Sequence, residues 1–178
     1  MKGCNCQTYG YTQEGFEGEC KETVVDVVVV GSGAAAMSAA VTAKSKGSSV
    51  IVLEKGKRLG GTTARSGGGF WIPGNALQKA AGYADSRDAC LRYMARYSYP
   101  NLYNPDDPEL GLGDRRYGLL ESFHDHATEM MDHHTEIGAI KPVLGIGWTG
   151  EAYPDYYDGI PENGGIRGRI LFATDESG

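Results

Sequence analysis

The stretch Val27-Val-Val-Val-Gly-Ser-Gly-Ala-Ala-Ala36 decides the fold of this chain. The β-branched run over residues 24–30 that leads into it predicts a strand buried on both faces, as in a parallel sheet. Residues 34–46 have high helix propensity, and residues 49–54 form a second β-branched run. Strand, helix and strand together span about 30 residues, the size of a βαβ unit. The chain is therefore predicted to have an α/β fold with a parallel sheet.

Three small residues in this stretch suit the binding of a dinucleotide. Gly31 turns the chain sharply off the strand, Gly33 lets the backbone approach a pyrophosphate, and Ala36 lets the helix pack tightly. We expect the pyrophosphate to lie on the exposed N–H groups of the helix that starts near Ala34. Glu54 ends the second strand about 20 residues further on. At this position of a dinucleotide-binding unit, an acidic side chain accepts hydrogen bonds from the ribose hydroxyls. The alternative is a tight turn between strand and helix that binds no ligand.

A second glycine-rich segment indicates which dinucleotide is bound: Gly60-Gly-Thr-Thr-Ala64, followed by Ser66-Gly-Gly-Gly69. FAD extends beyond its pyrophosphate, and its ring system must lie against backbone with few side chains in the way. Small residues and hydroxyls in this segment would donate hydrogen bonds to the pyrophosphate and the ring. A flexible surface loop is the alternative. The expected FAD-binding residues are Gly31, Ser32, Gly33, Ala34, Ala35, Ala36, Glu54, Lys55, Gly60, Gly61, Thr62, Thr63, Ala64, Ser66, Gly67, Gly68 and Gly69.

Beyond this unit the sequence predicts mainly helices. They are expected over residues 86–97, with Ser86 as the N-cap, and over residues 115–137. Residues 60–74 are expected to form a loop with a short helical start, and regular structure is expected to fade after Pro142. Only two parallel strands are evident, and such a sheet is not stable alone. We therefore expect an incomplete Rossmann-like FAD-binding domain, an N-terminal fragment that is inactive by itself.

Composition excludes several classes of protein. Glycine makes up 27 of the 178 residues, about twice the average usage. The net charge of −6, without a stripe of Lys and Arg, argues against a nucleic-acid partner. No apolar run is long enough for a transmembrane helix, and the polar N-terminus lacks the pattern of a signal peptide. A cytoplasmic protein without a membrane span is expected.

The N-terminal residues 1–22 are predicted to be a polar leader in front of a domain that covers residues 23–178. The leader contains Cys4, Cys6 and Cys20. A metal or cluster site is the alternative, but this spacing matches no common site and a fourth ligand is missing.

The histidines all fall in the second long predicted helix, as His124, His126, His133 and His134. A metal site would need ligands at a tighter spacing, such as i and i+4. Acidic residues are interleaved with these histidines, so a solvated polar face is expected and no metal.

Several segments together resemble a known family. The segments 27–36, 52–55, 60–64 and 66–73 are similar to the FAD-binding domain of the fumarate reductase/succinate dehydrogenase flavoprotein superfamily. Within it, Trp71-Ile-Pro73 resembles the 3-ketosteroid Δ1-dehydrogenase branch more than the fumarate reductases. A further segment supports that branch: Tyr153-Pro-Asp-Tyr-Tyr157, followed by Gly164-Gly165 and Gly168-Arg169.

The resemblance implies an FAD-dependent desaturation of a steroid-like ketone. A tyrosinate-like base takes a proton from C2, and a hydride leaves C1 for flavin N5, which gives a C1–C2 double bond. Because a free tyrosine has a pKa of about 10, neighbouring donors or positive charge must tune the base. By motif match Tyr156 assists the base through a hydrogen bond, and Tyr157 is the second candidate. The alternative is that both tyrosines only pack on a loop.

Two other functions stay open at this point. One is a fumarate-reductase-like reduction of an unsaturated carboxylate, which needs an arginine pair that the chain does not obviously offer. The other is a module that binds FAD without catalysis. The resemblance implies two partners, the ketone substrate and an electron acceptor. It also implies that the base tyrosine and the groups that polarise the substrate lie outside this chain, because the family is much longer.

Overall fold

The computed structural model describes residues 23–174. The predicted leader, with its three cysteines, lies outside the described residues. Within residues 23–174 no helix combines the length and the apolar character that a membrane span requires.

The βαβ unit is present as predicted. Strand β1 (Val27–Val30) and strand β2 (Val50–Leu53) pair in parallel, and helix α1 (Ala34–Ser45) connects them. Burial of the first strand on both faces is wrong: Val28 and Val30 are 54% and 80% exposed. The physical reason is that α1 covers one face of this two-stranded sheet, while the described residues place nothing on the other.

A second, antiparallel sheet was not predicted. It has the order β3 (Gly69–Trp71), β5 (Ile170–Ala173), β4 (Pro142–Leu144). Regular structure therefore continues after Pro142, and the segment 60–74, expected to be a loop, contains the strand β3. The strands have only three or four residues each, and their hydrogen-bond partners are distant in the sequence. Strands this short show neither the alternation of apolar and polar residues nor the length by which a strand is predicted from sequence.

The helices lie close to their predicted positions. Helix α3 (Arg87–Ser98) is capped by Ser86, whose side chain accepts from the Ala89 N–H, and helix α4 covers Asp114–Glu136. The short helix α2 (Ala76–Ala80) was not predicted. Two 3-10 turns complete the fold: η1 (Thr63–Arg65), the expected short helical start, and η2 (Pro161–Asn163).

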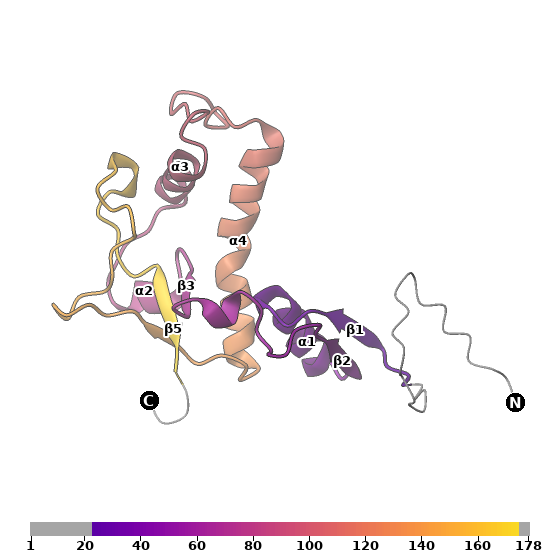
Figure 1. The fold of residues 1–178 in the computed structure, drawn as a ribbon. Coiled ribbons are helices and arrows are strands. Elements are labelled where there is room, and N and C mark those ends of the chain that lie inside the picture. The colour runs from indigo at the N-terminus through magenta and orange to yellow at the C-terminus, as the bar shows by residue number, and fades with distance from the viewer. Residues whose placement is uncertain (1–22, 175–178) are drawn as a thin grey trace, which may run out of the picture.

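Two buried apolar clusters hold the larger part of the molecule together. One joins α3 to the loop before α4, and the other joins α4 to the second sheet. Figure 1 shows α3 and this sheet beside α4, with the βαβ unit next to the C-terminal part of α4. Cys90 on α3 is fully buried, and burial raises the pKa of its thiol to about 12. At neutral pH this thiol is therefore protonated and inert.

The histidine face is only partly solvated. His126 is exposed, but His134 is 4% exposed. The His134 Nε2 lies 3.0 Å from the Ser38 hydroxyl of α1, and its Nδ1 lies 2.9 Å from the Met130 carbonyl. His134 therefore joins α4 to α1. Among residues 23–174 no group of three His, Cys, Asp or Glu side chains is placed to hold a metal.

Candidate functional site

The first part of the candidate site is the N-terminus of α1. Gly33 is its N-cap and supplies no side-chain cap, so the N–H groups of the first turn lack intrahelical partners. The Ala34 N–H donates to the Thr63 hydroxyl at 3.1 Å. A Cβ added at Gly33 would meet only that hydroxyl oxygen, at 3.9 Å. The helix thus presents N–H donors and an open surface, which suit a phosphate.

A buried serine joins the two glycine-rich segments. Ser32, 3% exposed, accepts from the Gly60 N–H at 2.8 Å and donates to a Glu54 carboxylate oxygen at 2.5 Å. The Gly56 N–H donates to the other oxygen of that carboxylate at 2.7 Å. These two hydrogen bonds, with that from Ser32 the stronger, lower the pKa of Glu54. Glu54 is thus held as a carboxylate at the end of β2, where it can accept hydrogen bonds from hydroxyl groups of a ligand.

The second glycine-rich segment packs against the first and remains open to solvent. Gly60 has φ +101°, and a Cβ there would lie 2.5 Å from the Ala64 Cβ, so only glycine fits. A Cβ at Gly61 would lie 3.7 Å from the Gly33 Cα. Residues 61–69 are all exposed, although Gly69 already belongs to β3 and pairs with β5. The structure therefore brings both predicted segments to one surface.

A polar cavity of about 640 Å³ adjoins this surface. Glu54 and three of the predicted loop residues line it, together with cations that the sequence analysis did not single out: Lys57, Arg58 and Arg65. Lys55, which was predicted, is exposed and is not among the lining residues. The run of basic residues directly after Glu54 was the available signal. Cations here can balance phosphate charge, so the residues present fit a dinucleotide.

A second cavity, of about 660 Å³, has aromatic walls. It lies between α3, α4 and the segment before η2, and its lining is Trp71, Tyr93, Met94, Tyr97, Ser98, Phe123, Tyr156 and Tyr157. Such a cavity suits a flat apolar ligand. Its Trp71 follows the second glycine-rich segment by two residues, so the aromatic cavity and the glycine surface are neighbours along β3.

The predicted tyrosines stand at the edge of this aromatic cavity. Tyr156 is 88% exposed, and the Tyr157 ring packs against the Tyr97 ring with centroids 4.2 Å apart. A hydrogen bond with Tyr157 raises the pKa of Tyr97, and burial raises the pKa of Tyr93. Both phenols are therefore neutral at physiological pH.

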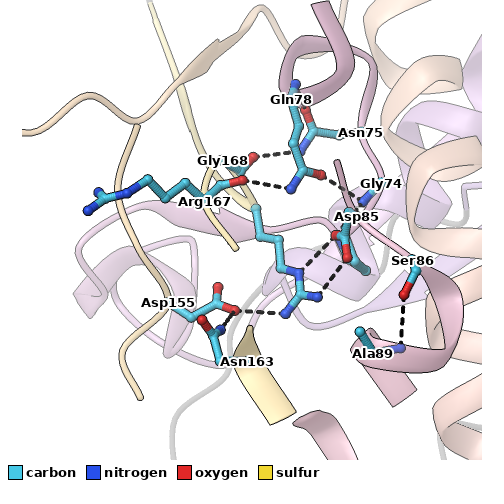
Figure 2. Close-up of polar contacts among 12 residues, drawn as sticks. Gly74, Asn75, Gln78, Asp85, Ser86, Ala89, Asp155, Asn163, Arg167 and Gly168 are labelled. Atoms are coloured by element: carbon cyan, nitrogen blue, oxygen red, sulfur yellow. Dashed lines mark hydrogen bonds and ion pairs between the residues drawn. The ribbon is translucent and has the colours of Figure 1, made fainter. Parts of the chain in front are cut away.

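An unpredicted ionic network lies beneath the cavity wall. The Arg169 side chain is fully buried and donates two hydrogen bonds to Asp85, at 2.8 and 2.7 Å, and one to Asp155, at 2.7 Å. Figure 2 labels both aspartates, and the hydrogen bonds of Arg169 place its guanidinium between them. Burial would lower the pKa of Arg169, but the hydrogen bond to Asp85 and the charges of both aspartates outweigh it and raise this pKa. The cation is therefore permanent.

The comparisons with known proteins agree with this geometry. The family model of the FAD binding domain matches residues 26–137, more than half of the chain. A 3-oxosteroid 1-dehydrogenase of Mycolicibacterium smegmatis is 55% identical over 69 residues, which are 39% of this chain and 12% of that protein. A 4-oxocyclohex-2-ene-1-carboxylate 5-dehydrogenase of Sinomonas cyclohexanicum is 36% identical over 158 residues, 87% of this chain and 23% of that protein.

A solved structure is also similar. The 3-ketosteroid Δ1-dehydrogenase of Sterolibacterium denitrificans, in complex with 1,4-androstadiene-3,17-dione, matches with a TM-score of 0.55 and 34% identity. The match covers 83% of this chain and 22% of that one. This chain thus spans about an eighth to a quarter of the length of these relatives. Because the family model matches more than half of the chain, the chain belongs to the FAD-binding domain family, and FAD is its cofactor.

Proposed function

We propose that this chain is the FAD-binding part of a dehydrogenase that desaturates a CH–CH bond beside a ring ketone, with a 3-ketosteroid as the substrate class. The observation that carries this proposal is the aromatic cavity of about 660 Å³, with Tyr156 at its edge and Trp71 next to the glycine-rich surface. Two relatives that were compared are named for the dehydrogenation of a ring that bears an oxo group, which supports the same class.

Residues of the two glycine-rich segments hold the cofactor in this proposal. The N–H groups at the start of α1 donate hydrogen bonds to the pyrophosphate, which lies against the open face of Gly33. Glu54 accepts hydrogen bonds from the ribose hydroxyls. Arg58 and Arg65 add positive charge beside Glu54. Bound FAD supplies the acceptor for the hydride that leaves the substrate.

The aromatic cavity serves the substrate in this proposal. Its walls exclude water and accept a flat apolar ring, while the Tyr156 hydroxyl donates a hydrogen bond to the base that removes the proton from the carbon beside the ketone. A hydrogen bond to an ionised base lowers the pKa of that base. Tyr156 thereby helps a tyrosine to act near neutral pH, far below its ordinary pKa of about 10.

Steady-state assays of the full-length protein test this function. With an artificial electron acceptor we expect oxidation of a 3-ketosteroid, and slower oxidation of 4-oxocyclohex-2-ene-1-carboxylate. We expect Tyr156→Phe to lower kcat by about 100-fold, the lower end of acid–base contributions. Tyr117→Phe, which lies outside the cavity, should leave kcat unchanged. Reduction of fumarate without oxidation of either ketone would refute the proposal, and FAD binding without turnover of any of the three would favour a binding module.

A further inference from the structure

We propose that Asp155 is a positioning residue: through Trp71 and Arg169 it holds the Tyr156 segment at a fixed place relative to the glycine-rich surface. The inference rests on the proposed function, because it concerns how Tyr156 is presented to the site. It adds Asp155 and Arg169, which do not line the aromatic cavity, as residues that act on the reaction through Tyr156.

Asp155 is held rigidly. Its side chain is 2% exposed, and its carboxylate accepts three hydrogen bonds: Oδ1 from the Trp71 indole N–H at 2.8 Å, and Oδ2 from Asn163 at 2.8 Å and Arg169 at 2.7 Å. A buried carboxylate is costly unless it is paired in this way. Because the donors lie in β3, in η2 and directly before β5, a shift of Asp155 would break contacts to all three.

The residue that follows the buried Asp155 already lines the aromatic cavity. Asp155 is 3% exposed, whereas the adjacent Tyr156 is 88% exposed. On the other side of Tyr156, the Tyr157 ring packs against Tyr97 of α3. Before Asp155, Pro154 pairs with Arg167 in an isolated bridge. Tyr156 therefore stands between two fixed points, and its own side chain remains free to meet a ligand.

The hydrogen bond from Trp71 connects this anchor to the cofactor surface. Trp71 ends β3, whose first residue, Gly69, is the last residue of the second glycine-rich segment. Trp71 pairs with Ile170 of β5, and Arg169 directly precedes that strand. The Tyr156 segment and the glycine-rich segment are thus joined through β3, β5 and one indole N–H.

The guanidinium also steadies the cavity wall. The Arg169 Cζ lies 5.3 Å from the centre of the Trp71 ring and 5.4 Å from that of Tyr93, within the range of a cation–π contact. Asp85, labelled in Figure 2, accepts two hydrogen bonds from the edge of the guanidinium that faces away from Asp155. The buried guanidinium and the stacking of the Trp71 ring on Tyr93 and Phe123 together set the orientation of Trp71, and with it the direction of its N–H.

Trp71→Phe tests this role with little change to the fold, because it removes the indole N–H while Asp155 keeps its bonds to Arg169 and Asn163. In the full-length holoprotein we expect unchanged FAD content, a kcat lowered about tenfold and a basic shift of the kcat–pH profile. Amide hydrogen exchange in the segment 153–160 should become faster. Trp148→Phe is the matched control, because Trp148 is fully exposed at a loop tip.

The double variant Trp71→Phe/Tyr156→Phe decides whether Trp71 acts through Tyr156. We expect its kcat to equal that of Tyr156→Phe alone, since effects that pass through one residue are not additive. Additive losses, an unchanged exchange rate in the segment 153–160, or loss of FAD in parallel with activity would overturn the positioning role. The exchange measurement needs no substrate, so it separates failure of this inference from failure of the proposed ketone oxidation.

Discussion

Residues 23–69 and residues 70–174 are built in opposite ways. In the first region only Val29, Ser32 and Ala40 are buried. The second region contains both apolar clusters and the ionic network of Arg169. The glycine-rich region is shaped by backbone, which leaves N–H groups and open surface for a ligand. The second region is shaped by side-chain packing, which holds the aromatic cavity and its tyrosines in place.

Substitutions in the two regions should therefore have different consequences. A change in the second region should lower the free energy of unfolding. A change in the first region should lower the affinity for FAD and leave the fold intact, because few side chains pack there. Three variants test this difference, in addition to the assays proposed above.

Arg169→Met should have the largest effect. It leaves Asp85 and Asp155 as buried carboxylates without their cation, and breaking such a network costs about 3 to 5 kcal/mol of unfolding free energy. Denaturant unfolding of the full-length protein measures this. The control Arg167→Met removes a partly exposed side chain with a carbonyl contact to Ala152, and it should cost about 1 kcal/mol. Equal losses in the two variants would show that the network does not hold the second region.

Gly33→Val should separate binding from folding. Gly33 has φ −71° and an open Cβ position, so valine fits the backbone, but its side chain fills the space proposed for the pyrophosphate. We expect FAD affinity to fall about 100-fold, or about 2.7 kcal/mol, with an unchanged unfolding midpoint of the apoprotein. Absorbance titration with FAD measures the affinity. Gly118→Val on α4, where no atom lies within 4 Å of the added Cβ, is the control. Retention of FAD by Gly33→Val would contradict the proposed cofactor surface.

Ser32→Ala should have the smallest effect. The Gly60 N–H and the Glu54 carboxylate both lose a partner, and one hydrogen bond of about 1 kcal/mol corresponds to about a fivefold loss of FAD affinity. Because Ser32 lowers the pKa of Glu54, the wild-type carboxylate stays ionised below its ordinary range, and its contribution is lost only as the pH falls through that lowered pKa. In the variant this acid-side loss of affinity should begin at a higher pH. Identical pH dependence in both proteins would exclude Glu54 as the group that titrates.

The local parts of the fold could be predicted from the sequence, and the long-range parts could not. The βαβ unit is encoded within residues 24–54, where β-branched runs, glycine and helix formers follow one another. The second sheet pairs Gly69 with Phe172, and no local period marks strands of three or four residues. The N-cap of α3 is a local feature of the same kind. Ser86 could be predicted because the serine and the N–H group that it caps lie within four residues of one another.

The candidate site divides in the same manner. Both glycine-rich segments were predicted by their composition, and their contact through Ser32 and Gly60 could not be predicted because it joins residues 28 positions apart. Tyr156 was singled out by resemblance to a family motif. The partners of its neighbour Asp155 were missed, because the Trp71 bond joins residues 84 positions apart.

The cofactor class and the βαβ unit could be predicted without the structure, because a turn that admits a pyrophosphate needs glycine at particular positions within a few residues. Most helix positions could also be predicted, since propensity and capping are local. The meeting of Arg169, Asp85 and Asp155 beneath an aromatic cavity became visible in the folded chain alone. Buried charged groups pair with whichever opposite charges lie next to them, and folding brings these three distant residues together.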